Sequence, residues 1–222
     1  MKCFIRKNDQ GFSLVELIVV VLIIGVLATA AGLAFSLVYN ADAERAAKRL
    51  SSLVSVARTQ AMAIDSGDGN VYVELKVFNY DGDNYAAVYK CEETHTNIGG
   101  VPVTNKTWTL IEPNEARSDN PLVPTTKLAN YGVSLEAGHK GTKLFDIDAT
   151  QALSFKFKKS TGGLTCTTKI APDGAASLAE SQAYGTPQID EDTSGFCTEV
   201  VLKGSETYTV IIVPATGKAF IK

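Results

Sequence analysis

One stretch of this sequence limits the folds open to it more than any other feature. From Leu17 to Phe35 no residue carries a charge, and Leu, Ile, Val and Ala dominate. That length is close to the ~20 apolar residues that a helix needs to cross the hydrocarbon core of a bilayer. After Ala41 the pattern is that of an ordinary soluble protein, with room for one domain and its core. The sequence therefore predicts a membrane-length helix followed by one soluble domain.

The charges around the apolar stretch are unevenly distributed. Lys2, Arg6, Lys7 and Asp9 give the first eleven residues a side-chain charge of +2, so the formal net charge of -3 leaves -5 on the remainder. A basic head in front of an apolar run is typical of a segment oriented in a membrane. The acidity of the remainder argues against a dedicated nucleic-acid surface, so no nucleic-acid partner is expected.

A cleavable secretory signal is the first alternative for this segment. Such a signal has an apolar stretch of roughly 7–15 residues before a small-residue cut site, and Ala28, Ala30 and Ala31 resemble such a site. Here the apolar stretch is longer, and Glu16 stands at its start. An ionised carboxylate deep in a bilayer costs roughly 2.5–3.5 kcal/mol or more, so such a residue usually faces a partner or marks a function. An ordinary anchor would gain from Leu at this position, so Glu16 indicates a different role.

The residues around Glu16 carry a specific resemblance. The run Gly11–Leu17, GFSLVEL, resembles the class III signal of type IV pilins and type II secretion pseudopilins. The resemblance implies that a prepilin peptidase cuts between Gly11 and Phe12 and methylates the new N-terminus at Phe12. It also implies that Glu16 of one subunit pairs with the N-terminal amine of a neighbour in a filament. A buried charge with a partner is tolerated, whereas a lone one is strongly destabilising, so this pairing would reward correct docking.

Partners, location and class of function follow from the same resemblance. It implies a structural filament subunit and not an enzyme, with other pilin or pseudopilin subunits, the prepilin peptidase, an inner-membrane platform protein and an assembly ATPase as partners. It implies a single-pass protein of the cytoplasmic membrane, N-terminus inside and C-terminal domain outside, that later enters an extracellular or periplasmic filament. Many family members have a proline midway through the span, where this chain has Leu33. A type IV pilus, a type II secretion pseudopilus and a DNA-uptake filament all remain open.

The apolar helix is expected to continue beyond the membrane. Apolar residues recur at intervals of three and four from Ala43 to Ile64, which is typical of an amphipathic helix. Turn-forming residues at 65–70 end it. The predicted organisation is a leader at residues 1–11, a transmembrane and filament-core helix at 12–40, its amphipathic continuation at 41–66 and a β-rich soluble domain at 67–222.

The sequence of the soluble part predicts antiparallel β-structure. Val71–Phe78 and Tyr85–Cys91 flank a turn and have the pattern of a hairpin. Further strands are expected at Thr107–Ile111, Tyr131–Leu135, Leu153–Lys158, Thr198–Lys203, Tyr208–Val213 and Ala219–Ile221. Polar loops are expected at Thr94–Lys106, Glu112–Lys127 and Pro172–Gly195. The predicted fold class is α+β and pilin-like, with the long N-terminal helix packed on an antiparallel sheet or sandwich.

Two short segments carry a second resemblance. Residues Leu50–Ala63, with the sequence ARTQA at Ala57–Ala61, are similar to the end of the first helix in H-type minor pseudopilins and related minor pilins. Tyr208–Ile211 and Thr216–Ala219 are similar to the closing hairpin of those proteins. This resemblance implies a minor subunit, with a major pilin as the alternative. A membrane-tethered or pilus-tip binding module, for adhesion or DNA uptake, is the second hypothesis for the function.

The cysteines allow one disulfide in an exported domain. Cys91, Cys166 and Cys197 lie in the soluble part, and no pair has the spacing of a zinc or thioredoxin-like motif. We favour Cys166 with Cys197, because both flank predicted strands, although sequence spacing does not fix the pairing.

Acidic clusters raise the question of calcium, which prefers several oxygen ligands. Asp190, Glu191 and Asp192 are the favoured candidates, ahead of clusters within residues 65–70 and 81–84. None has the spacing of an EF-hand, and Asp-Gly segments more often form plain turns. No metal and no cofactor is therefore expected.

The remaining candidates are histidines and aromatic residues. His95 and His139 are the two histidines of the chain, both in predicted polar loops without a nucleophile motif nearby, so no catalytic residue is expected. Trp108 and the tyrosines suit either a recognition surface or packing across a sheet, and packing is favoured.

Overall fold

A computed structural model describes residues 14–64, 70–98, 101–129, 132–170, 197–204 and 206–222. The chain divides into two compact units, Met1–Val38 and Tyr39–Lys222. Helix α1, Leu14–Ala63, begins in the first unit and ends in the second. Among the described residues of the second unit there are also ten strands, all in antiparallel pairs. The predicted α+β class is confirmed in this form.

The part of α1 that lies in the second unit is amphipathic, as the residue spacing predicts. The apolar residues of its buried face have at most 4% of their surface exposed; they are Ala43, Ala46, Ala47, Leu50, Leu53, Val54, Ala57 and Ala61. They recur on one face because the helix repeats every 3.6 residues. On the other face Lys48 Nζ contacts Glu44 Oε1 at 2.6 Å. The small alanine side chains let the strands approach the helix axis closely.

The first sheet has the strand order β3-β2-β1-β6-β7. Its strands are β1 Val71–Tyr80, β2 Asp83–Ile98, β3 Val101–Glu112, β6 Ala152–Phe157 and β7 Leu164–Ile170. Val73, Leu75 and Val77 of β1 belong to the core that includes α1, because alternate residues of a strand face the same side. Asp81 and Gly82 join β1 to β2, and both have positive φ, as a two-residue hairpin turn requires.

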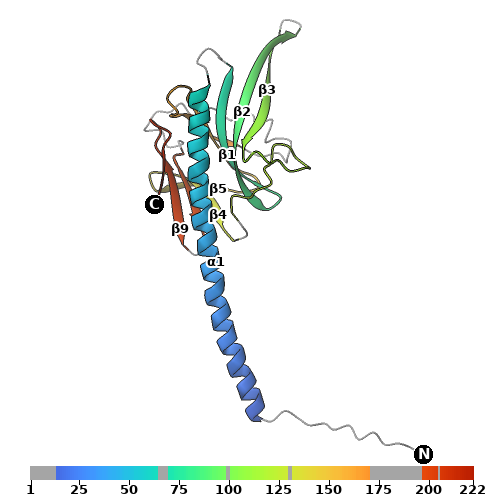
Figure 1. The fold of residues 1–222 in the computed structure, drawn as a ribbon, viewed down its shortest axis with the longest axis vertical. Helices are drawn as coiled ribbons and strands as arrows, with labels where there is room; N and C mark the ends of the chain where they lie inside the picture. The colour runs from blue at the N-terminus through green and yellow to red at the C-terminus, as the bar shows by residue number, and fades with distance from the viewer. Residues whose placement is uncertain (1–13, 65–69, 99–100, 130–131, 171–196, 205) are drawn as a thin grey trace, which may run out of the picture. The chain divides into compact units, whose positions relative to one another are not determined.

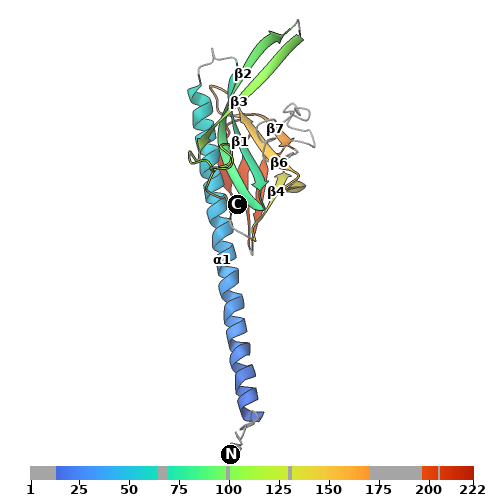
Figure 2. The ribbon, with the colours of Figure 1, turned by 90° about the vertical axis from the view of Figure 1, so that its right-hand side faces the viewer.

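Strands β2 and β3 extend beyond the rest of the first sheet. The pairing of β1 with β2 ends at Val71 with Glu92, whereas β2 and β3 remain paired as far as Ile98 with Val101. Residues 93–98 and 101–106 therefore form a two-stranded arm, which projects from the domain in both views (Figures 1 and 2). We call these residues the β2–β3 arm.

The second sheet has the order β10-β9-β8-β4-β5. Its strands are β4 Ser134–His139, β5 Thr142–Ile147, β8 Glu199–Lys203, β9 Thr207–Ile212 and β10 Ala219–Ile221. Leu135, Val200, Leu202, Val210 and Ile212 share one hydrophobic core with α1 and with the first sheet. Helix and sheets thus enclose one shared core, which lies alongside the part of α1 after Tyr39 (Figure 1). A second, smaller cluster is separate from it and consists of Phe78, Tyr85, Ala87, Tyr89, Val123 and Ala152.

Two turns and the helix meet at one end of this core. Arg58 of α1 donates from Nε to the carbonyl oxygen of Thr216, 2.7 Å away. The turn around Gly162 packs against the turn around Gly217, where an added Cβ would lie 1.9 Å from the carbonyl oxygen of Gly162. The close approach explains the glycine at position 217, where φ is also +64°.

Several predicted boundaries differ from the observed ones. The predicted loop Thr94–Lys106 is wrong, because most of it is paired strand in the β2–β3 arm. The predicted strand Tyr131–Leu135 is displaced, since β4 begins at Ser134. Strands β5 and β7 were not expected at all. The predicted loop Glu112–Lys127 corresponds to an irregular loop of residues 113–129, whereas the predicted loop Pro172–Gly195 lies outside the described residues.

Candidate assembly segment

The described part of the predicted assembly site is the first turn of α1. Gly11 and Phe12, the residues of the predicted cut, lie outside the described residues. Glu16 lies in the first helical turn. The N-terminal end of a helix carries a partial positive charge, which favours a carboxylate at this position. The sequence and the local structure thus agree on an acidic residue at the start of the apolar helix.

The residues that follow Glu16 expose an apolar surface on every side of the helix. Within residues 14–27 the large apolar side chains are between 45% (Val20) and 76% (Leu14) exposed. Fully burying one such side chain stabilises by roughly 1.5–3 kcal/mol relative to leaving it in water. A helix that is apolar all round is found in a membrane or in the core of a larger assembly. Within the part of the chain that the structure describes, this apolar surface remains exposed.

The polar groups of this segment are arranged for an apolar environment. Thr29 Oγ1 donates to carbonyl oxygens of its own helix, at 2.8 Å from Val26 and 3.2 Å from Gly25. Its hydroxyl therefore needs no water. In the sequence, Glu16 is the one charged residue between Ser13 and Ala41. Its carboxylate is thus the group whose burial would be most costly without a partner.

The cysteines give no described disulfide. Cys91 and Cys197 are buried and have free thiols. Burial raises the pKa of the Cys197 thiol to about 12, and the thiol lies 3.2 Å from the carbonyl oxygen of Glu199. Cys197 N donates to Thr167 Oγ1 on β7 at 3.1 Å. The side chain of Cys166 lies outside the described residues, and the free thiol of Cys197 gives the predicted pairing of these two cysteines no support.

The other candidate residues do not converge on a described site. Asp190, Glu191 and Asp192 lie outside the described residues. Within the described ranges no group of three or more His, Cys, Asp or Glu side chains could hold a metal ion. Asp83, from a second acidic cluster, contacts Lys127 Nζ at 2.7 Å.

Both histidines lie on strands and not in loops, contrary to the prediction. His95 is exposed on β2, within the β2–β3 arm. His139 ends β4, where its Nδ1 lies 3.2 Å from Thr198 Oγ1. Each histidine therefore lies in a sheet, although the polar residues around it predicted a loop.

Trp108 packs across the first sheet, as the sequence analysis favoured. Its ring meets the edges of Tyr72 and Tyr89, with centroids 6.0 and 6.3 Å apart. Lys76 Nζ lies 3.6 Å from the Trp108 ring centroid, and the Lys76 side chain is almost completely buried. Sequence reasoning did not anticipate this buried lysine, because its neighbours in β1 are apolar and suggested a simple core strand.

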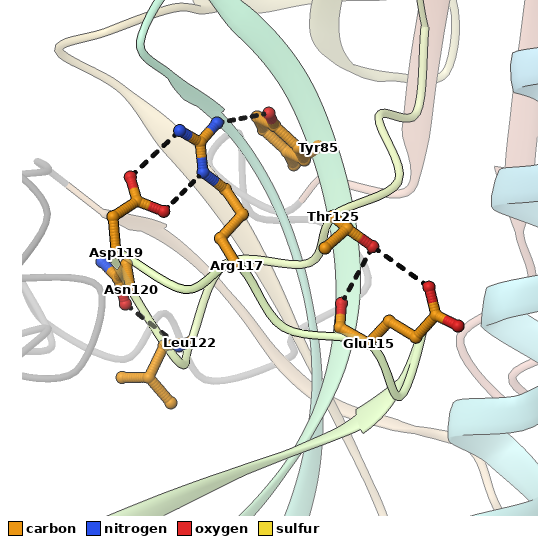
Figure 3. A network of polar contacts seen from close by, with 7 residues as sticks. All are labelled: Tyr85, Glu115, Arg117, Asp119, Asn120, Leu122 and Thr125. Carbon is orange, nitrogen blue, oxygen red and sulfur yellow. Dashed lines mark hydrogen bonds and ion pairs between the residues drawn. The ribbon is translucent and has the colours of Figure 1, made fainter.

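The loop of residues 113–129 is held on the sheet by the polar network of Figure 3. Arg117 donates from Nε and Nη2 to the carboxylate of Asp119 at 2.9 and 3.0 Å, and from Nη1 to Tyr85 Oη at 3.2 Å. The Arg117 guanidinium holds the pKa of Asp119 below its usual range. Val123 of the loop packs with Phe78 and Tyr85. The network holds the loop in place, so its role is structural.

Comparison with known proteins gives one match. A family model described as the prokaryotic N-terminal methylation motif matches residues 6–32. No curated protein and no solved structure matches the chain. Across the part of the chain that the structure describes, no helix is both long enough and apolar enough to cross a membrane. The motif nevertheless covers the predicted cut, Glu16 and most of the apolar stretch, so the chain carries the class III prepilin signal, which is consistent with the type IV pilin and pseudopilin family.

Proposed function

We propose that this protein is a structural subunit of a type IV pilus or a type II secretion pseudopilus, assembled through its N-terminal helix. The observation that carries the proposal is the methylation motif at residues 6–32 together with the exposed apolar surface that follows Glu16. A processing signal alone would suit any anchored protein. An apolar surface on all sides of one helix, with a single carboxylate at its start, suits packing among identical helices.

Processing creates a positively charged group that could pair with Glu16 of a neighbouring subunit. In the proposal, the prepilin peptidase cuts between Gly11 and Phe12, and Phe12 becomes the methylated N-terminus. The new amine is positive, and Glu16 lies at the fifth position of the mature chain. Pairing of the amine with the Glu16 of a neighbour neutralises two charges in an apolar filament core. Removing one partner of such a buried pair typically costs about 3–5 kcal/mol.

Before assembly the same apolar surface is proposed to lie in the cytoplasmic membrane. Leu17–Phe35 forms the span, with the N-terminus inside and the domain of residues 67–222 outside. The signal implies membrane anchoring through this helix and assembly with other pilin subunits. An inner-membrane platform protein and an assembly ATPase would then transfer the helix from lipid into the filament. The lipid and the filament core both keep water away from the apolar side chains, so the transfer of the helix loses little hydrophobic stabilisation.

A minor subunit is the finer form of the proposal. The segments that resemble H-type minor pseudopilins are Ala57–Ala61 and the closing hairpin. They are in contact in the structure, since Arg58 Nε donates to the carbonyl oxygen of Thr216. Two resemblances far apart in sequence thus meet in one structural feature, which supports a shared origin over a chance likeness.

The experiment combines N-terminal mass analysis with one substitution. Protein from membranes is expected to begin at N-methylated Phe12. Glu16→Ala is expected to be processed normally but to enter filaments at a tenth of the wild-type level or less. Glu44→Ala is the matched control, because it removes a carboxylate from the same helix whose partner is the exposed Lys48. A chain that begins after Ala30, or normal assembly of Glu16→Ala, would refute the proposal.

A pilus-tip or membrane-tethered binding module is the second candidate, for adhesion or DNA uptake. The β2–β3 arm favours it, because the arm projects from the domain and has exposed side chains at Thr94, His95, Thr96 and Asn97. A filament that assembles normally with a shortened arm but loses attachment to its target would support this role. Loss of assembly with the same variant would instead assign the arm to subunit contacts.

A further inference from the structure

A basic groove lies in the second unit, where the first residues of the amphipathic part of α1 meet the end of the 113–129 loop. Its volume is about 400 Å³. Asp42, Arg45 and Arg49 form the helical wall, and residues 125–129 form the other. The loop wall is fixed, since Leu128 N donates to the carbonyl oxygen of Asn84 at 2.8 Å.

The two arginines of the groove are only partly used by the protein. The Arg45 side chain is 79% exposed, and its described contact is with Asp42 Oδ1 at 3.6 Å. Arg49 Nη1 donates to the carbonyl oxygen of Lys127 at 2.9 Å, while Lys127 Nζ contacts Asp83. A guanidinium has five N–H donors in a planar fork. Most of the donors of both arginines therefore remain available to an anion in the groove.

The position of the groove along the chain is the second observation. The charge-free run from Leu17 to Ala41 would be about 37 Å long as a helix, at about 1.5 Å per residue. That length covers a hydrocarbon core of about 30 Å and most of one headgroup layer. Arg45 follows within about 6 Å of its end. Arg45 contacts Asp42, which lies one helical turn earlier in the sequence.

We propose that this groove binds the phosphate of a membrane phospholipid headgroup while the anchored subunit awaits assembly. The inference rests on the proposed function, because it needs the apolar segment to be in a membrane. Arginine matches phosphate with two parallel hydrogen bonds, and such charge-assisted bonds are stronger than neutral ones. The exposed Thr126 adds a hydroxyl to the same wall. Lipid binding would hold the domain against the membrane and be lost when the helix leaves it.

The charge distribution favours a single headgroup over a polyanion. Asp42 lies in the groove beside Arg45, and the chain after residue 11 carries a formal charge of -5. A nucleic acid needs several neutralised phosphates in succession, whereas one headgroup needs only the two arginines.

The test uses the full mature chain in detergent and counts bound lipids by native mass spectrometry. Phosphatidylglycerol is compared with a diacylglycerol of the same chains, which lacks phosphate, and with inorganic phosphate alone. Arg45→Gln is expected to weaken phosphatidylglycerol binding about fivefold, as expected for one arginine near a membrane surface. Lys48→Gln is the matched control, because Lys48 is a similar distance along the helix but contacts Glu44 outside the groove. Circular dichroism checks that both variants fold.

Each contrary outcome has a distinct meaning. Equal weakening by Arg45→Gln and Lys48→Gln would show diffuse surface electrostatics and overturn the site. Equal binding of phosphatidylglycerol and diacylglycerol would show that only the lipid tails are held. Binding of inorganic phosphate as tightly as the lipid would show a free-anion site. Failure of the proposed function would appear separately, as a chain that does not begin at Phe12.

Discussion

At the scale of single residues, Lys76 is the side chain whose surroundings most change its chemistry. Burial lowers the pKa of Lys76 to about 8, with a smaller contribution from Lys106, whereas Glu74 raises it. The rings of Trp108 and Tyr89 face its ammonium group at 3.6 and 5.4 Å, and cation–π contacts favour the charged form. Desolvation outweighs these contacts, so the folded protein holds this proton less tightly than the unfolded chain.

The lowered pKa of Lys76 therefore makes its contribution to the stability of the folded protein rise with pH. Between about pH 8 and pH 10.5 the unfolded chain binds the Lys76 proton and the folded protein does not, so the Lys76 contribution to the free energy of unfolding increases across this window. The full difference is about 3 kcal/mol. We expect the wild type to gain stability relative to Lys76→Met from pH 8 to pH 10 in urea unfolding followed by the fluorescence of Trp108. A difference that stays constant with pH would contradict the lowered pKa.

Gly217 gives a second prediction at this scale. Gly217→Ala places a Cβ 1.9 Å from the carbonyl oxygen of Gly162 and forces a φ of +64° on alanine. We expect a loss of about 3 kcal/mol or more in the free energy of unfolding, because both backbone strain and overpacking contribute. Gly82→Ala is the matched control, since φ is +82° there but no atom lies within 4 Å. The expected loss in the free energy of unfolding for Gly82→Ala is about 1–2 kcal/mol. Equal losses for the two variants would show that the contact between Gly217 and Gly162 does not contribute.

Single residues also show what sequence could and could not reveal. Glu16 was identifiable because a charge in an apolar run violates a local pattern. Arg45 and Arg49 gave no distinct signal, since Asp42, Glu44 and Lys48 lie among them, and the groove that the two arginines line depends on a loop about eighty residues away. Lys76 gave no signal, because its burial depends on side chains from neighbouring strands. Contacts across strands are not encoded in local spacing.

At the scale of elements, the β2–β3 arm is a hairpin without a supporting layer. Replacing His95–Thr104 by Asn-Gly would close the strands at Thr94 and Asn105, which face each other in the pairing. Asn-Gly suits a two-residue hairpin turn. We expect the melting temperature of the domain to change by no more than about 3 °C, since β1 pairs with β2 only up to Glu92. A larger fall in calorimetry would show that the arm supports the core.

The arm also explains an error of sequence reasoning. The side chains of Thr94–Asn97 are polar and exposed, so the alternation that marks a half-buried strand is absent there. The strands on either side of Gly99 and Gly100 were therefore assigned to a loop, and the two glycines themselves lie outside the described residues. By contrast, the apolar spacing of α1 predicted that helix closely, because its part in the second unit presents one face to the core.

At the scale of the whole molecule, the chain combines a domain that buries its own core with a segment that does not. Among described residues beyond the N-terminal stretch, the large apolar side chains that are exposed are Phe220 and Ile221. Composition alone predicted this division, since charges return only after Ala41. The arrangement of the two sheets was not predictable, because strand order depends on pairings such as β1 with β6 and β4 with β8.

This division predicts different association for two lengths of the chain. A protein of residues 39–222 is expected to be monomeric in detergent-free buffer, because its compact unit encloses the core. The mature chain from Phe12 is expected to need detergent and to form large assemblies when detergent is removed, since residues 14–27 expose apolar groups on every side. Light scattering after size-exclusion chromatography measures both. A dimer of the shorter chain that Phe220→Ser dissociates would place a second subunit contact on β10, and assembly would then depend on the domain as well as on the helix.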